Sequence, residues 1–92
     1  MNSPNVSSVR FTPARELDVA LGLIGWISVD IEGLRVDGIA LRRTGDGRLD
    51  LRYPSRPRSY GGHAIVRPVD DATRRSIEGQ ILGALRALGV AA

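Results

Sequence analysis

The sequence predicts an α+β domain: a small antiparallel sheet of about five strands followed by one C-terminal helix. Three observations lead to this prediction. Apolar and polar residues alternate over much of the first 67 residues, as strands with one buried face require. Short turn sequences rich in glycine, proline and aspartate separate these runs. After residue 70 the apolar spacing changes to three and four, which is typical of an amphipathic helix.

Composition narrows the class of protein further. The 92 residues fit one domain over residues 6–89, with residues 1–5 expected to be disordered. A chain this short buries roughly 60–65% of its unfolded surface, so a homodimer that shares a core is physically reasonable. The absence of cysteine excludes disulfides and thiolate nucleophiles. The N-terminus does not resemble a signal peptide and no apolar run could span a bilayer, so we expect a cytoplasmic protein without a membrane partner.

The first half of the chain reads as strands. Alternation over residues 8–12 predicts a short strand that a proline ends. Residues 17–31 then predict a long central strand, because one alternating set is wholly apolar and two glycines argue against a helix. Its second face would carry Ile24 and Trp26, either as a dimer surface or site, or covered by a loop or the helix. Glu32-Gly33 is a tight turn.

A third strand is expected over residues 34–44, with a bend at Asp37-Gly38. The following hairpin fits a three-residue loop with Gly47 in the left-handed conformation, because a two-residue loop would mix apolar and polar faces. The predicted register pairs Leu41 with Leu51 and Arg42 with Asp50. Its polar face carries Arg42, Arg48, Asp50 and Arg52, which form either a basic surface or a solvated face with an Arg42–Asp50 ion pair.

An irregular segment follows over residues 55–62, where Arg56 and Arg58 lie between Tyr53 and Tyr60. Arginines interleaved with aromatic residues suit single-stranded nucleic acid, because guanidinium groups bind phosphates and bases stack on rings. The alternative is a loop that is basic for solubility, with Tyr53 in the core.

The last third predicts one more strand and the helix. Residues 63–67 are the strand, with Ile65 facing the core. Asp70 or Asp71 caps the helix, and Gly89 ends it. The expected buried stripe consists of Ile77, Ile81, Leu85 and Leu88.

Charge is polarised along the chain. All thirteen basic residues are arginine, which either reflects a GC-rich genome or favours forked contacts to phosphate. Residues 42–75 hold nine arginines and four aspartates, whereas residues 1–41 hold three arginines and five acids. A basic half of this kind is typical of a protein that binds a polyanion. Arg74 can instead pair with Asp70 or Asp71 at helical spacing.

Enzyme chemistry has little support in the sequence. His63 is the only histidine, so a catalytic triad or a metal site would depend on a single candidate base. We therefore predict no enzymatic activity, no metal and no cofactor. A small enzyme centred on His63 is the weakest of three hypotheses.

Several segments together resemble a known family, the sporulation stage V protein G family of bacterial septation regulators. The segments are Arg35-Val36 with Gly38, Tyr53-Pro54-Ser55-Arg56, Pro68-Val69-Asp70, and Thr73-Arg74 with Ile77. The resemblance covers about residues 6–88. It implies a small sheet with a C-terminal helix, a homodimer, and binding of DNA or RNA without catalysis.

We therefore predict a regulatory protein that binds DNA or RNA and forms a homodimer through Ile24 and Trp26. The alternative is a homodimeric adaptor whose arginine loop binds an acidic protein partner. The expected nucleic-acid contacts are Arg42, Arg48, Arg52, Ser55, Arg56, Arg58, Arg67 and Arg74.

Overall fold

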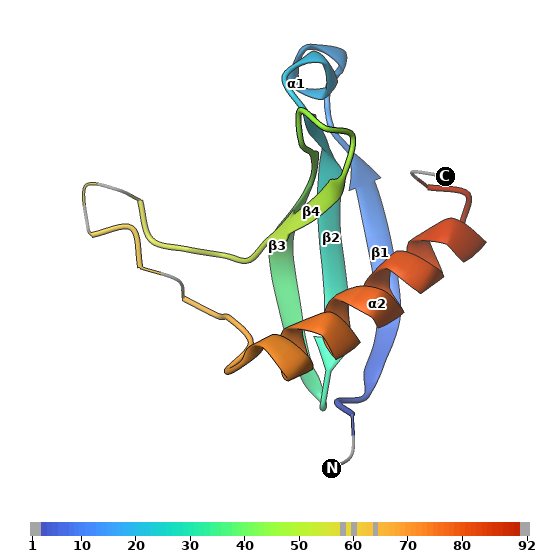
Figure 1. The fold of residues 1–92 in the computed structure, drawn as a ribbon, viewed down its shortest axis with the longest axis vertical. Coiled ribbons are helices and arrows are strands. Elements are labelled where there is room, and N and C mark those ends of the chain that lie inside the picture. Colours follow the sequence, from blue (N-terminus) through green and yellow to red (C-terminus); the bar gives the residue numbers. More distant parts are fainter. Residues whose placement is uncertain (1–2, 58, 60, 64, 91–92) are drawn as a thin grey trace.

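The structure is a computed structural model that describes residues 3–57, 59, 61–63 and 65–90. Its elements in chain order are β1 (Val6–Pro13), α1 (Glu16–Ala20), β2 (Leu23–Ile31), β3 (Leu34–Arg43), β4 (Leu49–Arg52) and α2 (Asp71–Ala87). The strands form one antiparallel sheet in the order β1-β2-β3-β4, and α2 lies diagonally across one face (Figure 1). The predicted α+β class is confirmed, with four strands in the described residues rather than five.

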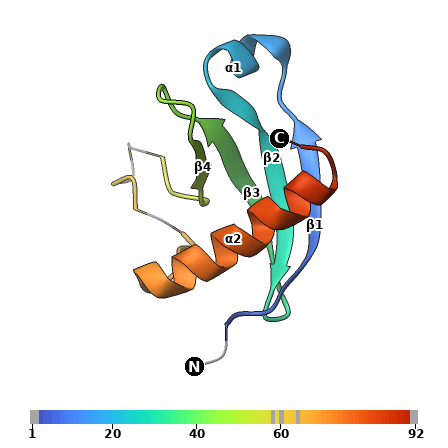
Figure 2. The same cartoon turned by 45° about the vertical axis from the view of Figure 1, so that its right-hand side comes forward.

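The core lies between α2 and the sheet face that it covers. Its buried residues are apolar and come from β2, β3, β4 and α2: Ile27, Val29, Val36, Ile39, Leu41, Leu51, Ile77, Ile81 and Leu85. Among the described segments, none lies across the opposite side of the sheet (Figure 2). We call that side the open face.

The β2–β3 hairpin has the tight turn that the sequence predicts. Glu32 and Gly33 both have positive φ angles, 50° and 80°, as a two-residue turn that matches the strand twist requires. The backbone N–H of Asn5 donates a hydrogen bond of 2.7 Å to the Glu32 carboxylate, so the chain just before β1 contacts this turn. The predicted bend in β3 is confirmed as a bulge, in which Gly38 has a φ of 79°.

The β3–β4 hairpin has the predicted register. Leu41 pairs with Leu51 and Arg42 pairs with Asp50. Gly47 has a φ of 86°, as the three-residue loop requires. This prediction was correct because only one loop length keeps the two leucines on the same side of the hairpin.

The predicted long strand over residues 17–31 is wrong in its first part. Residues 16–20 form the short helix α1, and Gly22, with a φ of 100°, turns the chain into β2. Leu17 and Leu21 are 78% and 77% exposed. The alternation over residues 17–21 does not lead to a strand, because β1 ends at Pro13 and does not extend far enough to pair with these residues.

The predicted fifth strand over residues 63–67 is absent from the described residues of that segment, and Ile65 is 64% exposed rather than in the core. Backbone hydrogen bonds nevertheless hold this segment against the chain that leaves β4. The Arg56 N–H donates to the carbonyl of His63 at 2.8 Å, and the Ile65 N–H donates to the carbonyl of Pro54 at 2.9 Å. Prolines in the outgoing segment lack the N–H groups that a longer ladder needs.

Helix α2 begins and packs largely as predicted. The Asp70 side chain accepts a hydrogen bond of 2.8 Å from the backbone N–H of Thr73, which satisfies one free donor of the first turn. This bond also lowers the pKa of Asp70, because it stabilises the carboxylate. The predicted stripe is buried at Ile77, Ile81 and Leu85.

The end of α2 explains the one error in that stripe. Leu88 is 60% exposed, because Gly89, with a φ of 79°, turns the chain back at this point. The Val90 N–H then donates to the Leu85 carbonyl at 2.8 Å, and Val90 packs against the core in place of Leu88. This is the Schellman arrangement of a helix terminus.

Gly25 provides a test of how β1 packs on β2. A Cβ atom at Gly25 would lie 2.5 Å from the Phe11 ring and 2.5 Å from the carbonyl oxygen of Thr12. We expect Gly25→Ala to lower the free energy of unfolding by about 3 kcal/mol, because backbone and ring must both move. Urea denaturation measures this change.

Gly79→Ala is the matched control for that substitution. Its Cβ would meet no atom within 4 Å, so the better helix propensity of alanine should stabilise the protein by up to about 1 kcal/mol. Equal unfolding midpoints for Gly25→Ala and the wild type would contradict the described packing.

Candidate nucleic-acid interface

The β3–β4 hairpin brings two of the predicted arginines to the open face. Leu41 and Leu51 pair with each other and both lie in the core. Because side chains alternate along a strand, Arg42, Asp50 and Arg52 point to the other side. The two arginines are therefore on one surface with a single aspartate beside them.

The partners of these arginines differ from the predicted ones. Arg52 Nε lies 3.4 Å from Asp50 Oδ2, whereas Arg42 Nη2 donates a hydrogen bond of 3.3 Å to the carbonyl of Leu21. The expected Arg42–Asp50 ion pair is thus replaced by a pair between neighbours on β4. The Arg52 side chain is 70% exposed, so water screens this pair and a phosphate could replace the carboxylate.

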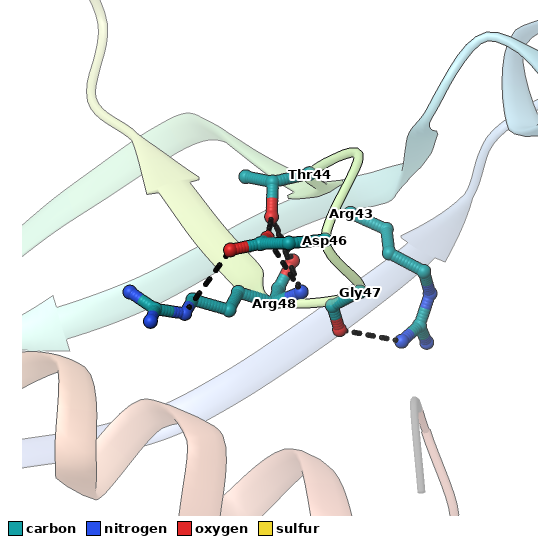
Figure 3. A network of polar contacts seen from close by, with 5 residues as sticks. All are labelled: Arg43, Thr44, Asp46, Gly47 and Arg48. Atoms are coloured by element: carbon teal, nitrogen blue, oxygen red, sulfur yellow. Dashed lines mark hydrogen bonds and ion pairs between the residues drawn. The ribbon is translucent and has the colours of Figure 1, made fainter.

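The tip of the hairpin is a network of short polar contacts (Figure 3). Thr44 donates its hydroxyl hydrogen bond to Asp46, and this bond lowers the pKa of the Asp46 carboxyl. Asp46 Oδ2 lies 3.3 Å from Arg48 Nε, and Arg43 Nη1 donates to the carbonyl of Gly47 at 3.2 Å. These contacts hold the loop in one conformation. Because Arg43 and Arg48 outnumber Asp46, the tip of the hairpin carries a net positive charge.

Residues 53–70, here called the arm, connect β4 to α2. The described part of the arm, residues 53–57, 59, 61–63 and 65–70, extends away from the sheet (Figure 1). Ser55, Arg56 and Arg67 are exposed on the arm. Arg58 and Tyr60, the other predicted loop residues, lie outside the described part of the chain. The arm therefore adds at least two exposed arginines to those of the hairpin.

Arg74 belongs to a different surface. It lies in the first turn of α2, where Nη2 contacts Asp71 Oδ1 at 2.8 Å, as the helical spacing allowed. This contact raises the pKa of Arg74. Because α2 and Arg52 are on opposite sides of the sheet, one flat ligand does not reach both, and Arg74 is separated from the predicted arginines of the open face.

Tyr53 is part of the core side rather than a stacking platform. It packs against the core and its hydroxyl donates a hydrogen bond of 3.2 Å to Glu78 Oε2 on α2. Burial, followed by the nearby Glu78 charge, raises the pKa of Tyr53. Burial likewise raises the pKa of Glu78, and the bond from Tyr53 opposes that rise.

A Tyr53→Phe variant tests this contact. Removal of the hydroxyl leaves the Glu78 carboxylate without this donor, so its pKa, already above the ordinary 4.5, should rise further. Ionisation of Glu78 costs stability as the pH rises through the raised folded pKa. We therefore expect Tyr53→Phe to cost about 1 kcal/mol at pH 7 and less at pH values below the Glu78 pKa.

The Glu78 pKa is measured by NMR titration of its side-chain carboxyl carbon, and stability by urea denaturation at each pH. Unchanged Glu78 titration in Tyr53→Phe would show that the hydroxyl does not bind the carboxylate in solution.

Ile24 and Trp26 do not lie together as predicted. The pairing register shifts between Leu23 and Gly25, so the strict alternation is broken at this point. Ile24 packs against the core, whereas Trp26 is 45% exposed. Only Trp26 of this pair is presented on the open face.

Sequence reasoning missed Arg10. This residue pairs with Ser28 in the β1–β2 ladder, and its charge contributes to lowering the pKa of Asp30. It therefore shares the open face with Trp26. The alternation in the first strand puts Arg10 among the polar side chains, but its position beside Trp26 depends on the order of the strands, which the alternation does not indicate.

The chain matches no protein-family model and no curated protein. The likeness to the septation regulators therefore rests on the sequence motifs and stays a prediction. No helix in the described residues is long and apolar enough to span a membrane. Within the same residues, no three His, Cys, Asp or Glu side chains gather in a way that could hold a metal ion. The fold and surface define a small α+β domain with arginines exposed on one sheet face, a hairpin tip and an arm.

Proposed function

We propose that the protein is a non-catalytic, regulatory nucleic-acid-binding protein, as the resemblance to the septation regulators implies. The observation that carries the proposal is the exposure of the arginines that follow one another through the hairpin and the arm. They are Arg43, Arg48, Arg52, Arg56 and Arg67.

The chemistry of these residues suits a polyanion. A guanidinium group can donate two parallel hydrogen bonds to one phosphate. The ion pairs of Arg48 and Arg52 involve side chains that are 84% and 70% exposed, so a phosphate can compete for them. Each phosphate bound in this way releases counterions, which makes the affinity depend steeply on salt.

The test is fluorescence anisotropy of labelled RNA and DNA across a salt series. We compare the wild type with a triple variant, Arg48→Ala/Arg52→Ala/Arg56→Ala. Each phosphate contact contributes about 0.7–0.9 to the slope of log K against log salt, so the triple variant should lose about 2–3 units of slope.

The matched control is Arg15→Ala/Arg86→Ala, which removes two exposed arginines outside the hairpin and the arm. It should leave most of the slope intact. Absence of binding at low salt, or an equal loss per arginine in the control, would contradict the proposed site.

A second inference concerns the homodimer and the exposed side chains of α1. Leu17 in α1 and Leu21, the residue that follows the helix, are four residues apart, and their side chains are 78% and 77% exposed. The carboxylate of Asp18 between them already pairs with Arg15. The arm also presents apolar side chains, because Ile65 and Val69 are 64% and 89% exposed. We infer that α1 of one copy binds the arm of a second copy.

Analytical ultracentrifugation tests this pairing. Leu17→Ser/Leu21→Ser should shift the protein from dimer to monomer, because it removes the apolar part of α1 while leaving the core intact. Leu34→Ser is the control, since Leu34 is 72% exposed and is the first residue of β3, outside α1 and the arm. A wild-type monomer, or a dimer that survives in the double variant, would refute the pairing.

A further inference from the structure

Trp26 lies in the middle of the open face. Its neighbours in the ladders are Thr12 on β1 and Ala40 on β3, and Ala40 in turn pairs with Arg52 on β4. Directly paired residues of an antiparallel sheet point to the same side, so these four side chains form one row. With a threonine and an alanine beside it, the indole ring has no bulky neighbour in its row.

Three arginines surround that ring. Arg10 is diagonal to Trp26 across the β1–β2 ladder, and Arg42 is diagonal to it across the β2–β3 ladder. Arg52 is two strands away in the same row. Diagonal positions are about 7–8 Å apart and neighbouring strands about 4.8 Å apart, so all three long side chains can reach a ligand that lies on the ring.

The carboxylates on the rest of the open face make contacts of their own. Arg35 Nε lies 2.8 Å from Asp30 Oδ1, and the Ser28 hydroxyl donates a hydrogen bond of 2.5 Å to Asp37. The bond from Arg35 lowers the pKa of Asp30, which keeps that carboxylate charged and paired. The four arginines of this face, Arg10, Arg35, Arg42 and Arg52, therefore outnumber its three aspartates, Asp30, Asp37 and Asp50, by one.

A protein partner fits this patch less well than a nucleic acid does. Protein interfaces have an apolar centre with few charges, whereas here one ring is surrounded by arginines and hydroxyl groups. Ile24, which would have enlarged the apolar area, packs against the core. An aromatic ring among guanidinium groups is the arrangement that binds a base by stacking and its phosphates by charge.

We propose that the open face binds single-stranded nucleic acid, with one base stacked on Trp26 and the backbone phosphates bound by Arg10, Arg42 and Arg52. The inference rests on the proposed function and specifies its ligand class. Bases of a duplex are already stacked and paired, so they cannot lie on a ring that projects from a sheet.

The protein carries its own probe for this contact, because Trp26 is its only tryptophan. Titration with a short oligouridylate or oligothymidylate should quench its fluorescence, whereas a short DNA duplex should leave it unchanged. Trp26→Ala should weaken single-strand binding by about tenfold to a hundredfold in anisotropy, and Trp26→Phe should restore part of that loss. Leu34→Ala, which changes another exposed apolar residue, should bind like the wild type.

Three results would overturn the inference. The first is that single strands bind in the anisotropy assay, but Trp26 fluorescence stays unchanged and Trp26→Ala binds with full affinity. This result would refute stacking but leave the proposed function in place. Equal quenching by the duplex would refute the single-strand preference. A blue shift of Trp26 emission with rising protein concentration, without nucleic acid, would place the ring in a protein interface. Circular dichroism of Trp26→Ala checks that the variant is folded.

Discussion

The packing of α2 on the sheet is the interaction on which the rest of the structure depends. Ile77, Ile81 and Leu85 cover the apolar side of β2, β3 and β4, and the chain is too small to build a second core. The other side of the sheet, the arm and α1 therefore remain in contact with water. The same packing separates the arginines, because it leaves Arg52 on one side of the sheet and Arg74 on the other.

Local patterns predicted the elements that local interactions determine. The β3–β4 register followed from matching Leu41 with Leu51, and the start of α2 followed from the capping aspartate. Alternation predicts strands over residues 17–21 and 63–67, and in the first case two glycines also argue against a helix. A strand, however, also needs a neighbour with free hydrogen-bonding groups. In the described residues, neither segment has a neighbouring strand that could pair along its whole length, and the sequence does not show this.

The arginine content of the candidate site is evident from the sequence, whereas its arrangement is not. The nine arginines between residues 42 and 75 predict a basic hairpin and loop, but not which carboxylate each arginine contacts. Asp50 pairs with Arg52 rather than Arg42 because Arg42 reaches the carbonyl of Leu21 at the end of α1. Since α1 was itself unexpected, this partner could not be foreseen. Arg10 was missed for a similar reason, because strand order alone brings it beside Trp26.

The hydrogen bonds at the base of the arm affect the entropy of any complex that it forms. Tyr53 is fixed to α2, Pro54 accepts from Ile65, and Arg56 donates to the carbonyl of His63. These contacts join the two ends of the arm at its base, so the chain that a partner would have to order is shorter than the whole arm. Loop-closure entropy changes by roughly 0.6 kcal/mol for each halving of length. Part of the ordering that a partner would otherwise impose on the arm is thus already complete in the folded chain.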